Sequence, residues 1–186
     1  PAPRKTMLQM LLLYLRLQLA AGAPPARGCT AQSTADSVIQ SARITLRNGT
    51  AIVTGAAGGL GYAAAASFAK AGAHVIVADY DAAAGAASAQ RIAELASATG
   101  NGGSAEFAFL DLASLRSVRA FVANISGRIS RPPLQFLIND AAGGKTGGPK
   151  TADGFQQNFE IDYLAPFLLT ELLLPSLRRS ARDGMR

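Results

Sequence analysis

Short apolar runs rich in β-branched residues alternate with longer segments of helical period from about residue 50 onwards. Each apolar run is short enough to cross a sheet that is buried on both faces, so these runs predict four β-strands. The longer segments repeat their apolar positions every three or four residues and predict helices. This alternation predicts βαβ units and therefore an α/β fold with a parallel sheet. The predicted strands are Thr50–Thr54, Ala73–Ala78, Ala105–Leu110 and Leu134–Asn139, and the predicted helices are Leu60–Ala71, Ala82 to about Ala98, Leu115–Ile125 and about Thr151–Leu177, with Pro166 interrupting the last.

A leucine-rich segment from Met7 to Ala23 precedes this region. It follows Arg4 and Lys5 and leads into an Ala/Pro-rich stretch, an order typical of a secretory signal peptide. Arg16 interrupts the apolar run, and an arginine near the middle of a bilayer costs about 2.5 to 3.5 kcal/mol, which disfavours a spanning helix. Three interpretations stay open: a cleaved signal or organelle-targeting peptide, a membrane anchor, and a mispredicted or untranslated start. The first two predict a location in the secretory pathway, the endoplasmic reticulum or an organelle.

Composition divides the chain into three parts. Residues 24–47 are polar, small and aperiodic, which predicts a linker. We therefore expect a targeting or anchor segment with its linker over residues 1–46, a folded domain over residues 47–178, and a basic tail over residues 179–186.

The formal net charge of +6 is carried by the two ends of the chain. Residues 1–43 have a net charge of +4 and residues 178–186 of +3, whereas residues 44–177 have a net charge of −1. Because the folded part is not basic, we expect no binding of nucleic acid. One cysteine, Cys29, and one histidine, His74, are too few for a Cys/His metal site and exclude an internal disulfide.

A glycine-rich turn, TGAAGGLG, follows the first predicted strand and opens the first predicted helix. Gly55 can adopt a tight turn, Gly59 lets the backbone approach a pyrophosphate, and Gly61 lets the helix pack close to the strand. Gly58 and Leu60 belong to the same turn. The N-terminus of the helix offers unpaired N–H groups and a partial positive charge to phosphates. The strand–turn–helix context therefore predicts a dinucleotide-binding site.

An acidic residue, Asp79, closes the second predicted strand and is followed by Tyr80. A carboxylate there can accept hydrogen bonds from the ribose hydroxyls of the adenosine and would repel a 2′-phosphate, while neither Gly58 nor Tyr80 supplies a cation. We therefore expect NAD to be favoured over NADP. Asp81 is better placed than Asp79 to cap the next helix, which leaves Asp79 free for the ribose.

Four ordered segments resemble the short-chain dehydrogenase/reductase family. The glycine turn matches its TGxxxGxG motif, and Asp111 and Leu112 resemble the Asp-Leu pair beside the adenine. The segment LINDAA, which contains Asn139 and Ala141, looks like the family's LxNNAG or LxNNAA segment. Residues 153–170 resemble the DGFExxFxxNxLGxFLLT helix of the branch with retinol dehydrogenases, WW-domain oxidoreductases and protochlorophyllide reductases.

The resemblance implies a Rossmann-type doubly wound sheet in the strand order 3-2-1-4, truncated after about four strands. It implies the cofactor-binding half of an NAD(P)-dependent oxidoreductase that transfers hydride to or from an alcohol or carbonyl group. It also adds cofactor contacts to those of the glycine turn, Asp79 and Tyr80, namely Asp111, Leu112, Asn139 and Ala141.

The sequence also departs from the family. Asp162 stands where the family has a catalytic asparagine, and an aspartate cannot donate the amide N–H. The chain has Asp140 and Ala142 where the NNAG segment has asparagine and glycine. The catalytic serine and the Tyr-x-x-x-Lys motif of the family have no counterpart before Arg186. We therefore expect an inactive chain, an incomplete gene model, and a fourth strand that is left as an uncovered apolar edge.

Two functions stay open. The first is an oxidoreductase whose full-length form acts on a hydrophobic alcohol or carbonyl substrate. The alternative is a non-catalytic dinucleotide-binding or interaction module. The helix over residues 151–177 is a candidate homodimer surface, and the segment from Met7 to Ala23 is a candidate for membrane association.

Overall fold

The computed structural model of the chain describes residues 30, 33–41, 45–129, 132–143 and 147–183. The chain divides into two compact units, Pro1–Ala42 and Arg43–Arg186. The leucine-rich segment and Cys29 lie outside the described residues, so the targeting and anchor interpretations stay predictions.

The described part of the first unit contains one helix, α2 (Ala35–Ser41). The Ser37 N–H donates to Thr34 Oγ1 at 3.2 Å, and the Thr34 N–H donates to Ser37 Oγ at 2.9 Å. Such reciprocal bonds satisfy N–H groups that a helix leaves unpaired at its start. The linker over residues 24–47 stays a prediction, and residues 35–41 within it form this short helix, in which no residue is buried.

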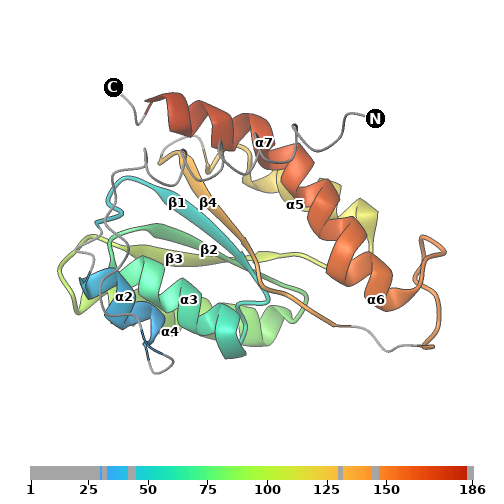
Figure 1. Ribbon diagram of the computed structural model, residues 1–186, viewed down its shortest axis with the longest axis horizontal. Coiled ribbons are helices and arrows are strands. Elements are labelled where there is room, and N and C mark those ends of the chain that lie inside the picture. Colours follow the sequence, from blue (N-terminus) through green and yellow to red (C-terminus); the bar gives the residue numbers. More distant parts are fainter. Residues whose placement is uncertain (1–29, 31–32, 42–44, 130–131, 144–146, 184–186) are drawn as a thin grey trace, which may run out of the picture. The chain divides into compact units, whose positions relative to one another are not determined.

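Four parallel strands form the sheet of the second unit, in the order β3-β2-β1-β4 (Figure 1). The strands are β1 (Thr50–Thr54), β2 (His74–Asp79), β3 (Ser104–Phe109) and β4 (Leu134–Asn139). Every residue of β1 is buried, as expected for a central strand with helices on both faces. The α/β fold with a Rossmann-type parallel sheet is confirmed. β1 and β4 have their predicted bounds, and β2 and β3 are displaced by one residue.

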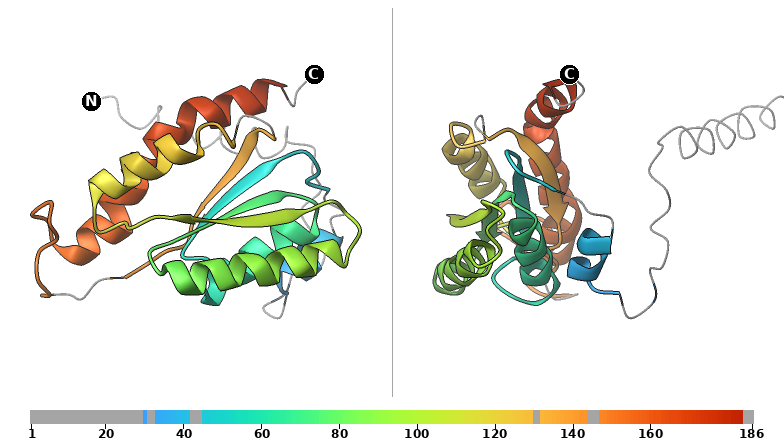
Figure 2. Two further views of the ribbon diagram at one scale, coloured as in Figure 1. Left: turned by 180° about the vertical axis from the view of Figure 1, so that it is seen from behind. Right: turned by 90° about the vertical axis from the view of Figure 1, so that its left-hand side faces the viewer.

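Helices cover both faces of the sheet (Figures 1 and 2). α3 (Gly59–Lys70) and α4 (Ala82–Ser97) pack on one face, and α5 (Leu115–Ile125) and α7 (Ala165–Asp183) pack on the other. Packing of apolar side chains between the layers removes them from water and stabilises the fold. A buried hydrophobic cluster lies under α5 and α7 and includes Ile52, Ile76, Val118, Phe121, Leu169 and Leu173.

The prediction of one helix over residues 151–177 needs correction at its start. The chain first makes a turn over residues 151–156, closed by a β-bridge between Lys150 and Gln156. Gly154 has φ +85° in this turn, a conformation that favours glycine. The helix begins only with α6 (Gln157–Phe159).

A π-helical turn, η1 (Glu160–Leu164), separates α6 from α7. Pro166 follows it in the first turn of α7. Proline lacks an N–H and its ring crowds the preceding helical turn, and a wider π-turn relieves both problems. The interruption that we expected at Pro166 is therefore located in η1. α7 continues to Asp183, so residues 179–183 are helical rather than part of a separate tail.

β4 is an edge strand, since its one partner among the described residues is β1. We expected an uncovered edge at Phe136, Leu137 and Ile138. Phe136 is 36% exposed, and its ring packs on Phe68 with 5.1 Å between centroids. Leu137 and Ile138 are half-buried, and Leu137 contacts the core under α7. The expectation therefore applies to Phe136 more than to its neighbours, because α7 covers one face of β4.

Candidate functional site

The glycine turn connects β1 to α3 at the carboxyl end of the sheet. Gly55 has φ +69° and Gly59 has φ +57°, values that favour glycine. A Cβ on Gly61 would lie 2.5 Å from the Gly55 carbonyl oxygen, so the predicted close packing at Gly61 is present. A Cβ on Gly58 or Gly59 would meet no atom within 4 Å. The turn is therefore tightly packed on its inner side and open at its tip.

The N-terminus of α3 begins at this open tip. Gly58 is the N-cap residue, and no side chain forms a capping hydrogen bond there. The first N–H groups of a helix have no partner within the helix, and the helix dipole places a partial positive charge there. This arrangement can bind an anionic group such as a phosphate.

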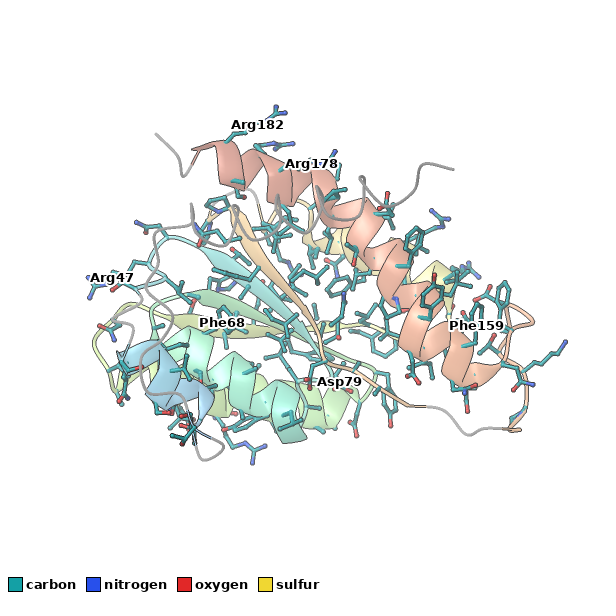
Figure 3. The ribbon with its side chains drawn as sticks, viewed as in Figure 1. Arg47, Phe68, Asp79, Phe159, Arg178 and Arg182 are labelled. Carbon is teal, nitrogen blue, oxygen red and sulfur yellow. The ribbon has the colours of Figure 1, made fainter. Side chains whose placement is uncertain are left out.

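Asp79 lies at the end of β2 and is only 8% exposed (Figure 3). Its Oδ2 accepts the Ala57 N–H at 3.0 Å, and its Oδ1 accepts the Asp81 N–H at 3.1 Å. Asp79 therefore fixes the glycine turn as well as bordering the site. Asp81 caps α4 as predicted, because its Oδ1 accepts the Ala84 N–H at 2.9 Å.

Thr54 joins the glycine turn to the loop after β4. Its Oγ1 accepts the N–H groups of Asp140 and Ala141, each at 3.1 Å. A Cβ on Gly55 would lie 2.8 Å from the Ala141 Cα, so the two segments are in close contact. The loop after β3 is the third segment of the site, after the glycine turn and the loop after β4. In it, Asp111 Oδ1 accepts the Ala113 N–H at 2.9 Å.

These segments surround a cavity of about 920 Å³ at the carboxyl ends of the strands. In open α/β sheets, ligands bind at this end, where the connections diverge to opposite faces. Leu60 and Tyr80 are 80% and 73% exposed at its border. The predicted site residues that line it are Gly55, Gly58, Gly59, Leu60, Asp79, Tyr80, Asp111, Leu112 and Ala141.

Three predicted residues are placed differently. Gly61 does not line the cavity but supports the turn behind it. Asn139 also lies outside the lining, and its Nδ2 donates to Thr170 Oγ1 on α7 at 3.2 Å. Asp162 is exposed beside the cavity, and its Oδ1 accepts the Gly143 N–H at 2.8 Å. Aspartate therefore retains an acceptor function at this position.

Sequence reasoning missed Glu160, which is fully buried in η1. Its neighbours Gln157 and Ile161 line the cavity. Burial raises the pKa of the Glu160 carboxyl, Asp153 and Asp111 raise it further, and a hydrogen bond from Thr151 opposes them. The sequence held one sign of this buried acid, namely a glutamate among the periodic apolar positions of the predicted helix.

The charge of the lining is negative. It contains Asp79, Asp81, Asp111 and Asp140, and no Lys, Arg or His among the lining residues that the structure describes. The described part of the chain contains no group of three or more His, Cys, Asp or Glu side chains suited to a metal ion.

Within the described residues, no helix is both long enough and apolar enough to cross a membrane.

Comparison with known proteins relates most of the chain to one family. The sequence profile described as "short chain dehydrogenase" matches residues 49–185. The human protein named polyprenol dehydrogenase is 39% identical over 134 residues, which cover 72% of this chain and 39% of that protein. Mouse retinol dehydrogenase 14 is 44% identical over 138 residues, which cover 71% of this chain and 41% of that protein. The chain thus spans about two fifths of the length of these curated relatives.

Solved structures agree with the sequence comparison. The Pseudomonas aeruginosa RhlG/NADP active-site complex superposes with a TM-score of 0.59 and 28% sequence identity. The match covers 73% of this chain and 50% of that chain. The predicted resemblance to the family is therefore confirmed over the folded unit.

Proposed function

Because this chain belongs to the short chain dehydrogenase family, we propose that it is the cofactor-binding part of an oxidoreductase that acts on an alcohol or carbonyl group. The observation that carries this proposal is the open tip of the glycine turn at the cavity. Space beside Gly58 and Gly59, together with the uncapped N-terminus of α3, suits the pyrophosphate of a dinucleotide. A bound nicotinamide dinucleotide would accept or donate the hydride.

The chain's own residues have distinct positions toward that cofactor. The glycine turn and α3 would hold the pyrophosphate. Asp79 has a second lone pair on each carboxylate oxygen for the ribose hydroxyls, beyond its two backbone bonds. Asp111 and Leu112 would border the adenine.

We propose NAD rather than NADP as the cofactor. The carboxylates of Asp79 and Asp81 lie beside Tyr80 in the lining, and a 2′-phosphate there would meet negative charge without a cation. This preference rests on these side chains alone. The comparison does not favour NAD, because it includes a relative solved with NADP.

The substrate that we propose is a hydrophobic alcohol or carbonyl compound. The names of two relatives, polyprenol dehydrogenase and retinol dehydrogenase 14, support this class. The 186-residue chain has four tyrosines, and a lysine follows none of them at the fourth position. A family-type tyrosine with its lysine is therefore missing from this sequence, and we propose that this chain binds NAD without turnover.

The test is a calorimetric titration of the chain with NAD and NADP, repeated for Gly59→Val. Valine strains the positive φ of Gly59 and fills the open tip, so NAD binding should be lost. Gly100→Val is the matched control, because Gly100 has φ +67°, equally open surroundings and no place in the cavity lining.

Undiminished NAD affinity in Gly59→Val would refute the assigned position of the pyrophosphate, and tighter binding of NADP would refute the cofactor preference. Turnover of an alcohol or aldehyde by the purified chain would refute inactivity. Binding without turnover would also agree with the alternative of a non-catalytic binding module.

A further inference from the structure

Two carboxyl groups meet behind the wall of the cavity, at the turn over residues 151–156. Glu160 is fully buried, and its Oε2 accepts a hydrogen bond from the Thr151 hydroxyl. Its Oε1 is buried and has no hydrogen-bond partner among the described residues. A buried acceptor without a partner is costly, and an ionised one is more so. The unpaired Oε1 oxygen of Glu160 therefore needs a hydrogen-bond partner to offset the cost of its burial.

Asp153 supplies the second carboxyl group, in a different environment. Its side chain is exposed, and its Oδ2 accepts the Leu115 N–H at 2.8 Å, at the N-terminus of α5. Solvent and the helix dipole both favour the ionised form of Asp153. Asp153 also raises the pKa of Glu160, because its carboxylate is a negative charge and can accept a hydrogen bond from the protonated Glu160 carboxyl.

One proton would resolve both the buried charge of Glu160 and the missing hydrogen-bond partner of its Oε1. A proton on Glu160 removes the buried charge and turns the unpaired oxygen into an O–H donor. The Asp153 carboxylate is then a ready acceptor, and a hydrogen bond with one ionised partner is among the stronger ones. Two adjacent carboxyl groups in unequal environments commonly separate into one acid and one carboxylate in this way.

We propose that Glu160 and Asp153 share one proton, and that this pair fastens η1 to the turn over residues 151–156 and, through Leu115, to α5. Glu160 is then a positioning residue for the cavity. Gln157 and Ile161, on either side of Glu160, line one wall. Asp111 to Ala113, which lead into α5, line a second wall. The pair therefore sets the spacing of the two walls that would enclose the adenine end of NAD, an inference that rests on the proposed function.

This arrangement makes the site sensitive to pH. The charged groups that act on Glu160 are Asp153, from the turn, and Asp111, from the end of β3, and both are acidic. The pKa of Glu160 is therefore higher in the folded chain than in the unfolded chain. The stability that the shared proton contributes is full below the unfolded-state pKa and is lost as the pH rises through the folded-state pKa.

The direct test is a carbon-13 NMR titration of the side-chain carboxyls in the full chain. We expect the Glu160 signal to titrate above the ordinary range of glutamate and to move down in Asp153→Asn, which removes the neighbouring charge. Thr151→Val should move it up, because the hydroxyl stabilises the ionised form. An ordinary midpoint for Glu160 that Asp153→Asn leaves unchanged would overturn the shared proton.

The functional test measures NAD affinity against pH. Glutamine has the shape of protonated glutamic acid, so Glu160→Gln should bind NAD with little pH dependence. The wild-type chain should lose NAD affinity above the Glu160 midpoint of the free chain, by up to about tenfold per pH unit, until the pH reaches the Glu160 midpoint of the NAD-bound chain. Glu171→Gln removes the same charge at an exposed position of α7 and should behave as the wild type. NAD is the suitable ligand because its pyrophosphate stays ionised throughout.

The outcomes separate the two proposals. Equal pH profiles for the wild type and Glu160→Gln would overturn the positioning function of Glu160. Absence of NAD binding at every pH would overturn the proposed function, and the NMR titration would still decide whether the proton is shared.

Discussion

Thr54 connects two segments of the candidate site through a single oxygen atom. Its hydroxyl is almost fully buried and accepts N–H groups from Asp140 and Ala141. Sequence reasoning assigned Thr54 to the end of a strand and to the first position of the TGxxxGxG motif, but it did not assign partners to the hydroxyl, because a threonine in a TAIVT run carries no sign of its distant partners. Contacts of this kind depend on the strand order, which places β4 beside β1.

Replacement of Thr54 by valine should destabilise the chain. Valine keeps the shape of threonine but leaves two N–H groups without their acceptor, which should cost about 1 to 3 kcal/mol of unfolding free energy. Urea denaturation of Thr54→Val against the wild type measures this loss. Thr54→Ser keeps the acceptor and should recover most of it. A loss of unfolding free energy in Thr54→Ser with none in Thr54→Val would show that the methyl group, not the hydrogen bonds, matters.

Asp79 shows how far residue-level reasoning extends. Its place at the end of a strand was predictable, and so was the availability of Asp81 as a helix cap. The bonds from Ala57 and Asp81 to its carboxylate were not, because they depend on the backbone path of the glycine turn. A variant at Asp79 would therefore disturb the turn as well as the ribose contact.

At the scale of elements, apolar periodicity located the strands and helices that cross the core, with bounds that differ by at most a residue or two through α5. It failed where the helix is irregular. A π-turn differs from an α-helical turn in its i→i+5 hydrogen bonds, and the residue types around η1 do not reveal that difference. Pro166 signalled an irregularity but not its position or type.

Four aromatic residues form an exposed row along the turn over residues 151–156, α6, η1 and the start of α7. They recur every four residues, and successive rings contact each other in two of the three steps, with centroids 6.2 Å and 5.5 Å apart. Ala165 and Leu169, which are buried, lie on the opposite side of the helix. Figure 3 shows Phe159 on the side turned away from the sheet. The members of this aromatic row are Phe155, Phe159, Tyr163 and Phe167, exposed by 38%, 47%, 62% and 58%.

For the predicted homodimer, we propose that the aromatic row of one copy packs on that of a second. We expect the double variant Phe159→Ser and Phe167→Ser to shift the chain toward the monomer in sedimentation equilibrium, with little change in melting temperature. Leu95→Ser, at an exposed apolar position of α4, is the control and should leave the association unchanged. A monomeric wild-type chain at micromolar concentration would contradict the dimer.

At the scale of the whole molecule, the sequence predicted the class of fold and the end of the sheet at which the site lies. The glycine turn, the strand ends and the family resemblance all place their residues there, and the cavity lies at that end. The sequence did not predict the acid pair at Glu160 and Asp153, because their contact depends on how the turn over residues 151–156 folds back onto η1. Side-chain chemistry of that kind appears only when the elements are assembled.

The strand order also has a kinetic consequence. β1 is the first strand of the sheet to be synthesised but lies between β2 and β4, and Thr54 and Asp140 are 86 residues apart in sequence. Contacts between distant residues cost more chain entropy to form and slow folding, whereas β1, α3 and β2 are close in sequence. We expect pulsed hydrogen exchange during refolding to protect the amides of β1 and β2 before that of Ala141. Simultaneous protection would contradict this order. The glycine turn would then form early, and the cavity would be completed only when the fourth strand docks.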